Sequence, residues 1–188
     1  MAPFVGLTGG LGAGKSEALR ILEELGASTL STDAVVHELL ASDEVQRTLA
    51  ERFGADVAAD RALIAERVFG DDGERAWLEG LLWPLVGKRV AAWRSSLPGE
   101  RVAVVEVPLL FESGMEEVFD ATIAVIADEA TREQRAAARG HAAVAERAGR
   151  QLSQAQKAER ADFTVRNDGS LDELRQTLSR VLEKIEVL

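Results

Sequence analysis

The N-terminal part of the chain alternates between apolar runs and helical stripes. Residues 2–8 form an apolar run typical of a buried strand, and residues 15–25 carry apolar side chains at helical spacing. A short second strand is expected at 27–30. It is followed by a helix whose N-terminus Thr32 or Asp33 can cap. The order strand, helix, strand, helix indicates an α/β fold.

The middle of the chain has the pattern of consecutive helices. Three apolar stripes at helical spacing run through residues 43–97, and Pro84 interrupts the third of them. This is too much helix for a single crossover between two strands. We therefore predict an inserted helical subdomain over about 33–98, with the core of the fold at about 1–32, 99–128 and 161–188.

Strands return in the second half of the chain. They are expected at 101–107, 120–126 and 162–165, and Ser170 is placed to cap a last helix. Residues 129–160, before the last strand, are helical in pattern, charged and rich in arginine. Strands that alternate with helices predict a parallel sheet covered on both faces, with ligands at the carboxyl ends of its strands.

A glycine-rich motif connects the first strand to the first helix. Gly9, four intervening residues, then Gly14, Lys15 and Ser16 fit the P-loop spacing, which binds the phosphates of a nucleotide. Glycines let backbone N–H groups approach phosphate oxygens, and the N-terminus of the following helix favours the same anion. Lys15 supplies positive charge to the β- and γ-phosphates, and the Ser16 hydroxyl can bind Mg²⁺.

A dinucleotide-binding turn is the alternative for this motif. Its glycine spacing differs from the run Gly10-x-Gly12-x-Gly14 found here, and that fold has no use for a lysine at position 15. The apolar strand before the loop and the helical stripe after it favour phosphate binding by a P-loop.

Two further features suit phosphoryl transfer, and each has a plainer explanation. Asp33 follows the second strand, at the same sheet edge as the P-loop. A carboxylate there can take the proton of an acceptor hydroxyl, but Asp33 can also be a simple helix cap. Arg135 and Arg139 share one helix face, which favours an anion between them and a lid over about 129–160. The plainer alternative for the arginines is a solvated face with Glu–Arg pairs.

Other titratable residues give weaker indications. Glu106 and Glu112 flank the end of the third strand, and either can reach Mg²⁺ through water. His37 and His141 lack metal-ligand spacing, so neither is expected to bind a metal.

Composition narrows the classes of partner. The 188-residue chain carries a net charge of −10, so neither a nucleic-acid surface nor an anionic membrane is an expected partner. It has no cysteine and no apolar run long enough to span a membrane. We expect a single cytoplasmic domain that acts on small molecules.

Taken together, the motifs of this chain resemble those of the dephospho-coenzyme A (dephospho-CoA) kinase family. The resemblance covers essentially the whole chain. It is carried by the Gly6–Ser16 loop, Asp33, the run Pro108-Leu109-Leu110-Phe111-Glu112, Arg135, Arg139, Arg147, Gln151 and the segment 161–169.

The resemblance implies a fold, a reaction and a set of site residues. The fold is a P-loop three-layer sandwich: a five-stranded parallel sheet with a helical substrate subdomain and an arginine-rich lid. The reaction is ATP-dependent phosphorylation of the ribose 3′-hydroxyl of dephospho-CoA, with Mg²⁺. Asp33 would be the base, helped by Lys15 and Arg139. His37 and Leu110 would join Asp33 at the acceptor. ATP would be bound by Thr8, Gly10, Gly12, Ala13, Gly14, Lys15, Ser16, Glu17 and Asn167.

The chain departs from the family at a few positions. Only the second aspartate of the usual Asp-Ala-Asp is present, as Asp33, and His37 stands where an arginine is usual. A neutral imidazole holds phosphate less well than guanidinium, so the departures bear on acceptor affinity. Another P-loop small-molecule kinase, acting on a nucleoside, nucleotide or sugar acid, is the main alternative. A GTPase-like switch is disfavoured because the chain has no Asn-Lys-x-Asp guanine signature.

Overall fold

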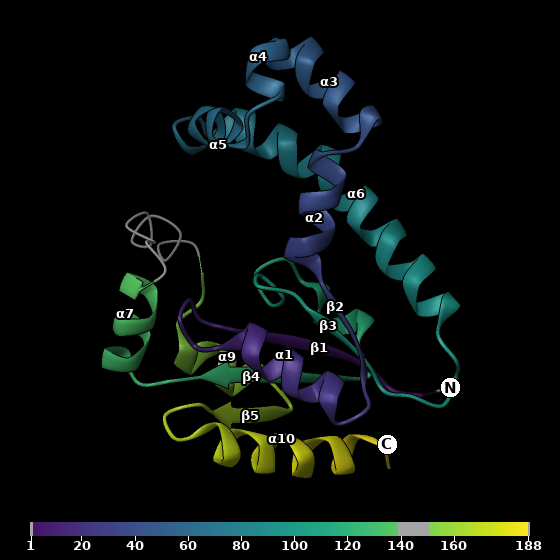
Figure 1. Cartoon of the computed structure of the whole chain (residues 1–188), viewed down its shortest axis with the longest axis vertical. Helices are drawn as coiled ribbons and strands as arrows, with labels where there is room; N and C mark the ends of the chain where they lie inside the picture. The colour runs from purple at the N-terminus through teal and green to yellow at the C-terminus, as the bar shows by residue number, and fades with distance from the viewer. Residues whose placement is uncertain (1, 139–150, 188) are drawn as a thin grey trace. The chain divides into compact units, whose positions relative to one another are not determined.

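A computed structural model describes residues 2–138 and 151–187 of the chain (Figure 1). Its centre is a five-stranded, fully parallel sheet with the order β2-β3-β1-β4-β5. The α/β architecture and the parallel sheet predicted from the sequence are confirmed. The strands are β1 (Phe4–Gly9), β2 (Ser28–Ser31), β3 (Ala103–Glu106), β4 (Ala121–Ile126) and β5 (Phe163–Arg166).

The chain divides into two compact units. Unit 1 comprises Met1–Ser31 and Leu97–Leu188 and contains the whole sheet, whereas unit 2 comprises Thr32–Ser96 and is entirely helical. No helix in the described part of the chain is both long enough and apolar enough to cross a membrane.

One face of the sheet is covered by α1 (Lys15–Glu24) and α10 (Leu171–Ile185). Val5 and Leu7 of β1 point into this layer, where Leu22 and Leu178 of the two helices are also fully buried. Burying a leucine or valine side chain stabilises a fold by about 1.5–3 kcal/mol, so this layer anchors α1 firmly on β1. The capping box of Ser170 and Glu173 confirms the predicted start of α10.

The opposite face of the sheet is covered by α9 (Gln154–Arg160) and by the segment 107–119, which includes the 3₁₀ helix η1 (Met115–Val118). Gly6 of β1 faces this layer. A Cβ there would lie 2.9 Å from the Phe119 ring and 3.0 Å from Leu110, so the close packing requires glycine. α9 is thus part of the core of unit 1.

The start of α7 (Glu129–Ala138) is fastened to the turn after β5. Asp168 Oδ1 accepts a hydrogen bond of 2.6 Å from the Asp128 N–H. Asp128 in turn accepts hydrogen bonds from the Thr131 N–H and hydroxyl, and these lower its pKa. The start of α7, the helix that carries Arg132 and Arg135, is therefore held beside the β5–α10 turn.

Unit 2 consists of helices packed on a core of its own, which includes Val35, Leu49 and Ile64. α6 continues through Pro84, so the interruption predicted there is wrong. A proline inside a helix costs about 3 kcal/mol. Leu82 and Val86 are buried on either side of it, and this burial offsets the cost. The helices are α2 (Thr32–Leu40), α3 (Asp43–Phe53), α4 (Ala55–Ala58), α5 (Arg61–Phe69) and α6 (Asp72–Ser96).

Candidate phosphate-binding site

The phosphate loop, residues 9–16, connects the carboxyl end of β1 to the N-terminus of α1. Gly14 is the N-cap of α1 with a φ of 93°, and Gly12 has a φ of 75°. Both angles lie in the left-handed region that favours glycine. A Cβ at Gly12 would also lie 2.6 Å from the Arg132 carbonyl oxygen. The loop therefore needs glycine both for its turn and for the close approach of α7.

Lys15 is the first residue of α1, and its side chain turns back over the loop. Its Nζ donates hydrogen bonds of 3.1 Å to the carbonyl oxygens of Gly9 and Gly10. Ser16 follows it in the first helical turn and is exposed. An ammonium, an exposed hydroxyl and a helix N-terminus thus meet at one point, which suits an anion with several oxygens.

Side chains from distant segments hold the loop in place. Arg132 Nε donates to the Leu11 carbonyl at 2.9 Å, and Asn167 Nδ2 donates to the Ala13 carbonyl at 2.9 Å. Arg135 Nη1 in turn donates to the Asn167 carbonyl at 3.1 Å. The predicted nucleotide residue Asn167 is therefore a buried support of the loop. Arg135 thus lies beside the phosphate loop, and its expected contact with an anion stays a prediction.

Gln154 is a further support that the sequence analysis missed. Its side-chain amide bonds both the N–H of Ala127, at 3.0 Å, and the carbonyl of Ala127, at 2.7 Å, just beyond β4. It also lies against Gly10, where a Cβ would come within 2.9 Å of its Cγ. Only the fold brings residues 10, 127 and 154 together, so no local pattern could have revealed this contact.

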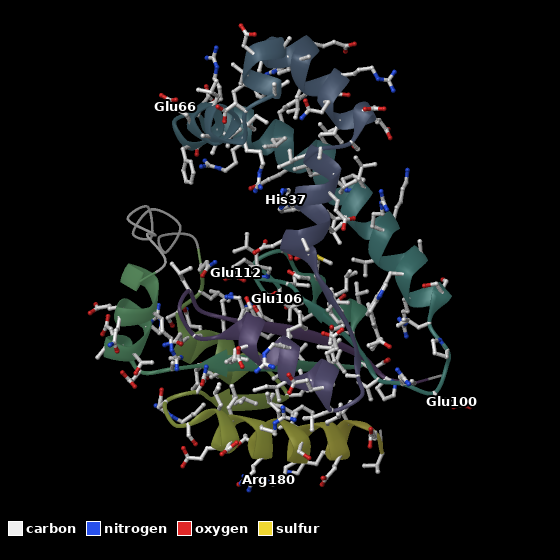
Figure 2. The ribbon with its side chains drawn as sticks, viewed as in Figure 1. His37, Glu66, Glu100, Glu106, Glu112 and Arg180 are labelled. Carbon is white, nitrogen blue, oxygen red and sulfur yellow. The ribbon has the colours of Figure 1, made fainter. Side chains whose placement is uncertain are left out.

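Two glutamates, both labelled in Figure 2, lie near the end of β3. Glu106 is 5% exposed at the carboxyl end of β3, in register with Leu7 of β1 and Ser31 of β2. Glu112 forms an ion pair of 2.9 Å with Lys157 and accepts a hydrogen bond of 2.8 Å from the Leu152 N–H. Glu106 therefore lies at the sheet edge from which the phosphate loop departs, and Glu112 forms an ion pair with Lys157.

Comparison with known proteins decides the family. A family model described as dephospho-CoA kinase matches residues 3–173. A dephospho-CoA kinase of Protochlamydia amoebophila is 37% identical over 97% of this chain and 96% of its own length. That of Deinococcus radiodurans is also 37% identical, over 97% of this chain and 92% of its own length. The chain belongs to the dephospho-CoA kinase family.

Several solved structures are similar to this chain over most of its length. The crystal structure of TT1252 from Thermus thermophilus matches with a TM-score of 0.85 and 30% identity, covering 97% of each chain. The dephospho-CoA kinase from Campylobacter jejuni matches with a TM-score of 0.73 and 25% identity over 100% of this chain and 98% of that one. A shikimate kinase from Acinetobacter baumannii, at 15% identity and a TM-score of 0.55, shares the fold alone.

The residues that the dephospho-CoA kinase resemblance assigned to the acceptor fall in both units. Asp33 and His37 lie in α2 of unit 2, four positions apart, and both are exposed. Asp33 is the second residue of that helix, so it is not the N-cap. Leu110 lies in unit 1 and its side chain is fully buried behind Gly6. Arg139 lies outside the described residues.

Two predicted nucleotide residues are already engaged by protein groups. Thr8 is fully buried, and its hydroxyl donates to the Pro108 carbonyl at 3.3 Å. The Glu17 carboxylate pairs with Arg20, whose hydrogen bond lowers the pKa of Glu17. In this structure, Thr8 and Glu17 therefore contact protein groups beside the phosphate loop.

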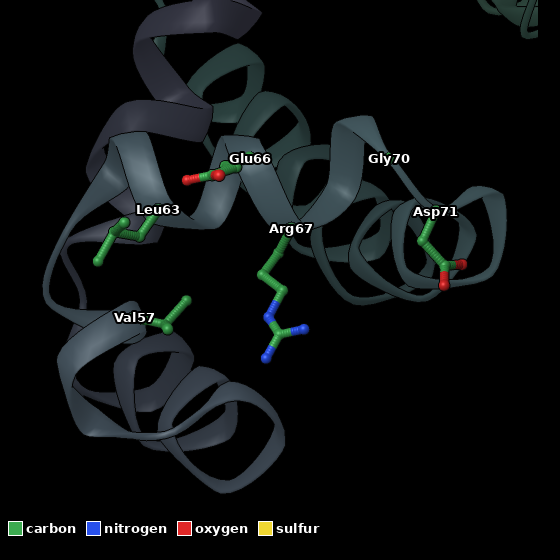
Figure 3. A pocket seen from close by; sticks show the side chains of 6 residues that line it. All are labelled: Val57, Leu63, Glu66, Arg67, Gly70 and Asp71. Carbon is green, nitrogen blue, oxygen red and sulfur yellow. The ribbon is translucent and has the colours of Figure 1, made fainter.

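A surface cavity of about 480 Å³ lies within unit 2, lined by residues of α4, α5 and the turn before α6 (Figure 3). Its walls combine the apolar side chains of Val57 and Leu63 with the charged side chains of Glu66, Arg67 and Asp71. None of the residues that the sequence analysis assigned to ATP, acceptor or metal lines it.

The described residues offer few side chains that could together bind a metal ion. Within residues 2–138 and 151–187, no group of three or more His, Cys, Asp or Glu side chains could hold a metal ion. Mg²⁺ at nucleotides is typically bound by phosphate oxygens and water with only one or two protein ligands. The exposed Ser16 hydroxyl at the end of the phosphate loop fits that pattern.

Proposed function

We propose that this chain transfers the γ-phosphoryl group of ATP to the ribose 3′-hydroxyl of dephospho-CoA, giving CoA and ADP. The observation that carries the proposal is the match of residues 3–173 to the dephospho-CoA kinase family in a chain that keeps Lys15 and Ser16 at the start of α1. Its substrates are therefore small molecules, and we propose the cytoplasm, with its ATP pool, as its location.

Phosphate binding rests on the phosphate loop. Lys15 exchanges the carbonyls of Gly9 and Gly10 for oxygens of the β- and γ-phosphates, which are stronger acceptors for a charged donor. The loop needs little rearrangement, because Arg132 and Asn167 already hold its backbone. Such preorganised charge is the main contribution that a protein makes to phosphoryl transfer.

Mg²⁺ would neutralise negative charge that develops on the phosphates during transfer. Ser16 would hold it through its hydroxyl. Of the two candidate carboxylates, we propose Glu106 as the one that orients the metal's water shell. It lies at the carboxyl end of β3, the strand next to β1 and to the phosphate loop that follows β1.

Asp33 is proposed as the general base. It is exposed in the first turn of α2, so a substrate hydroxyl can approach its carboxylate. A carboxylate oxygen of Asp33 would accept the proton of the 3′-hydroxyl while the hydroxyl oxygen of the substrate attacks the γ-phosphorus. His37, four residues further along the helix, would face the same substrate and supply a weaker phosphate contact than an arginine. The acceptor role of Leu110 and the charge contribution of Arg139 remain predictions.

The test is ADP release by the purified protein with ATP and Mg²⁺, measured with and without dephospho-CoA. We expect release that depends on the acceptor and a 3′-phosphorylated product by mass. Release with a nucleoside, nucleotide or sugar acid, but not with dephospho-CoA, would favour another P-loop kinase. Hydrolysis that no acceptor stimulates would contradict both.

A further inference from the structure

Lys157 is a buried charge that the proposed chemistry does not use. Its side chain is fully buried in α9, on the face of the sheet opposite to α1 and α10. Its Nζ donates to the Pro108 carbonyl at 2.7 Å and approaches the Thr8 hydroxyl at 3.4 Å. It also pairs with Glu112 at 2.9 Å. These contacts use the three donors of the ammonium.

Such an arrangement costs free energy unless every charge is matched. A lone ammonium in the interior would lose most of its hydration, which costs several kcal/mol. Glu112, whose side chain is 13% exposed, offsets this charge and accepts a second hydrogen bond from the Leu152 N–H. Uncharged residues at both positions would avoid the cost, so we ask what the pair contributes besides hydrophobic packing.

The contacts of Lys157 join three segments. Thr8 is the second-last residue of β1, directly before Gly9 where the phosphate loop begins, and Pro108 is the second residue of the segment that follows β3. Lys157 itself lies in α9, three residues after Gln154, which packs against Gly10. One ammonium therefore fixes the end of the strand from which the phosphate loop departs, relative to the segment 108–112 and to α9.

We propose that Lys157, neutralised by Glu112, is a positioning residue for phosphoryl transfer. It acts through Thr8 on the place where the phosphate loop leaves the sheet, and it does not contact the substrates. This inference rests on the proposed binding of nucleotide at that loop. Displacements of about 1 Å at a reacting centre can lower turnover by about a hundredfold, so a modest shift at Thr8 is enough to be measured.

The test is Lys157→Met, which keeps the length and apolar stem of the side chain but removes its charge and donors. Lys184→Met, on the exposed surface of α10, is the matched control. Binding of MgADP is measured by calorimetry, and kcat and KM for ATP by ADP release, all below the melting temperature of each variant. We expect about tenfold weaker MgADP binding and about a tenfold lower kcat for Lys157→Met, with the control unchanged.

A double variant separates positioning from folding. Lys157→Met with Glu112→Gln removes the charge pair together, so much of the melting temperature lost in the single variant should return. Function should not return, because the bonds to Pro108 and Thr8 stay broken. Recovery of kcat and MgADP affinity along with stability would overturn the proposal. So would normal values of both in folded Lys157→Met.

A third variant keeps the test usable if both of these unfold. Thr8→Val retains the shape of the side chain and removes only its hydroxyl; we expect two- to fivefold weaker MgADP binding, and unchanged binding would overturn the proposal. Because MgADP binding does not involve an acceptor, it is informative even if dephospho-CoA proves not to be the substrate.

Discussion

Unit 1 and unit 2 present their proposed functional residues in opposite ways. In unit 1 the phosphate loop is held by side chains from α7 and from the turn after β5, which lie more than a hundred residues away along the chain. In unit 2, Asp33 and His37 are exposed on α2. A phosphate group has the same shape in every nucleotide, so a rigid cradle suits it. The groups proposed for the acceptor are instead exposed, so a substrate can approach them.

The largest effect is expected from Lys15→Ala in unit 1. Removal of the ammonium leaves the β- and γ-phosphates without their point charge, so turnover should fall by about a thousandfold or more. MgADP affinity, measured by calorimetry, should fall with it. Lys184→Ala is the matched surface control. Retention of nucleotide affinity in Lys15→Ala would mean that the cradle itself, and not this charge, binds phosphate.

Asp33→Asn in unit 2 should separate chemistry from nucleotide binding. Loss of a general base typically lowers turnover by about 10²–10⁴-fold, while MgADP affinity should stay near that of the wild type. Steady-state kinetics and calorimetry on the same preparation check both parts. A kcat within about twofold of wild type would show that Asp33 serves only the helix N-terminus, where its charge is also favourable.

The two glutamates provide the next prediction, within unit 1. Glu106→Gln should raise the Mg²⁺ concentration needed for half-maximal activity by about tenfold, because its charge no longer orients the metal's water. Glu112→Gln should instead lower the melting temperature, because it leaves the charge of Lys157 unmatched, and should keep the Mg²⁺ requirement. Magnesium titrations of both variants, with thermal melts, make the comparison. The opposite pattern would exchange the two roles.

The smallest effect is expected from His37→Arg. A guanidinium provides fixed charge and paired donors, so KM for the acceptor should fall about two- to tenfold while KM for ATP stays constant. Initial rates over a matrix of both substrate concentrations measure the two constants. Lys at the same position is the control for charge without the paired geometry. An equal change in both constants would contradict the assignment of this residue to the acceptor.

Sequence determined the elements that depend on local periodicity and spacing. The strands, the phosphate loop and the capped start of α10 all follow from patterns within about ten residues, and the structure contains them where they were expected. Pro84 shows the limit of this approach. Its local preference to break a helix is overruled by the burial of Leu82 and Val86, which the surrounding unit provides.

Tertiary structure alone decided how the loop is supported and that Glu112 pairs with Lys157. Lys157 meets Thr8 across 149 positions of sequence, and Gln154 meets Ala127 across 27. In the sequence, Glu106 and Glu112 were equivalent candidates, and Lys157 was one charged residue in a charged helix. A hydrogen bond or ion pair depends on distance in space, and the packing of α9 on β1 and β4 sets that distance, not the spacing of residues along the chain.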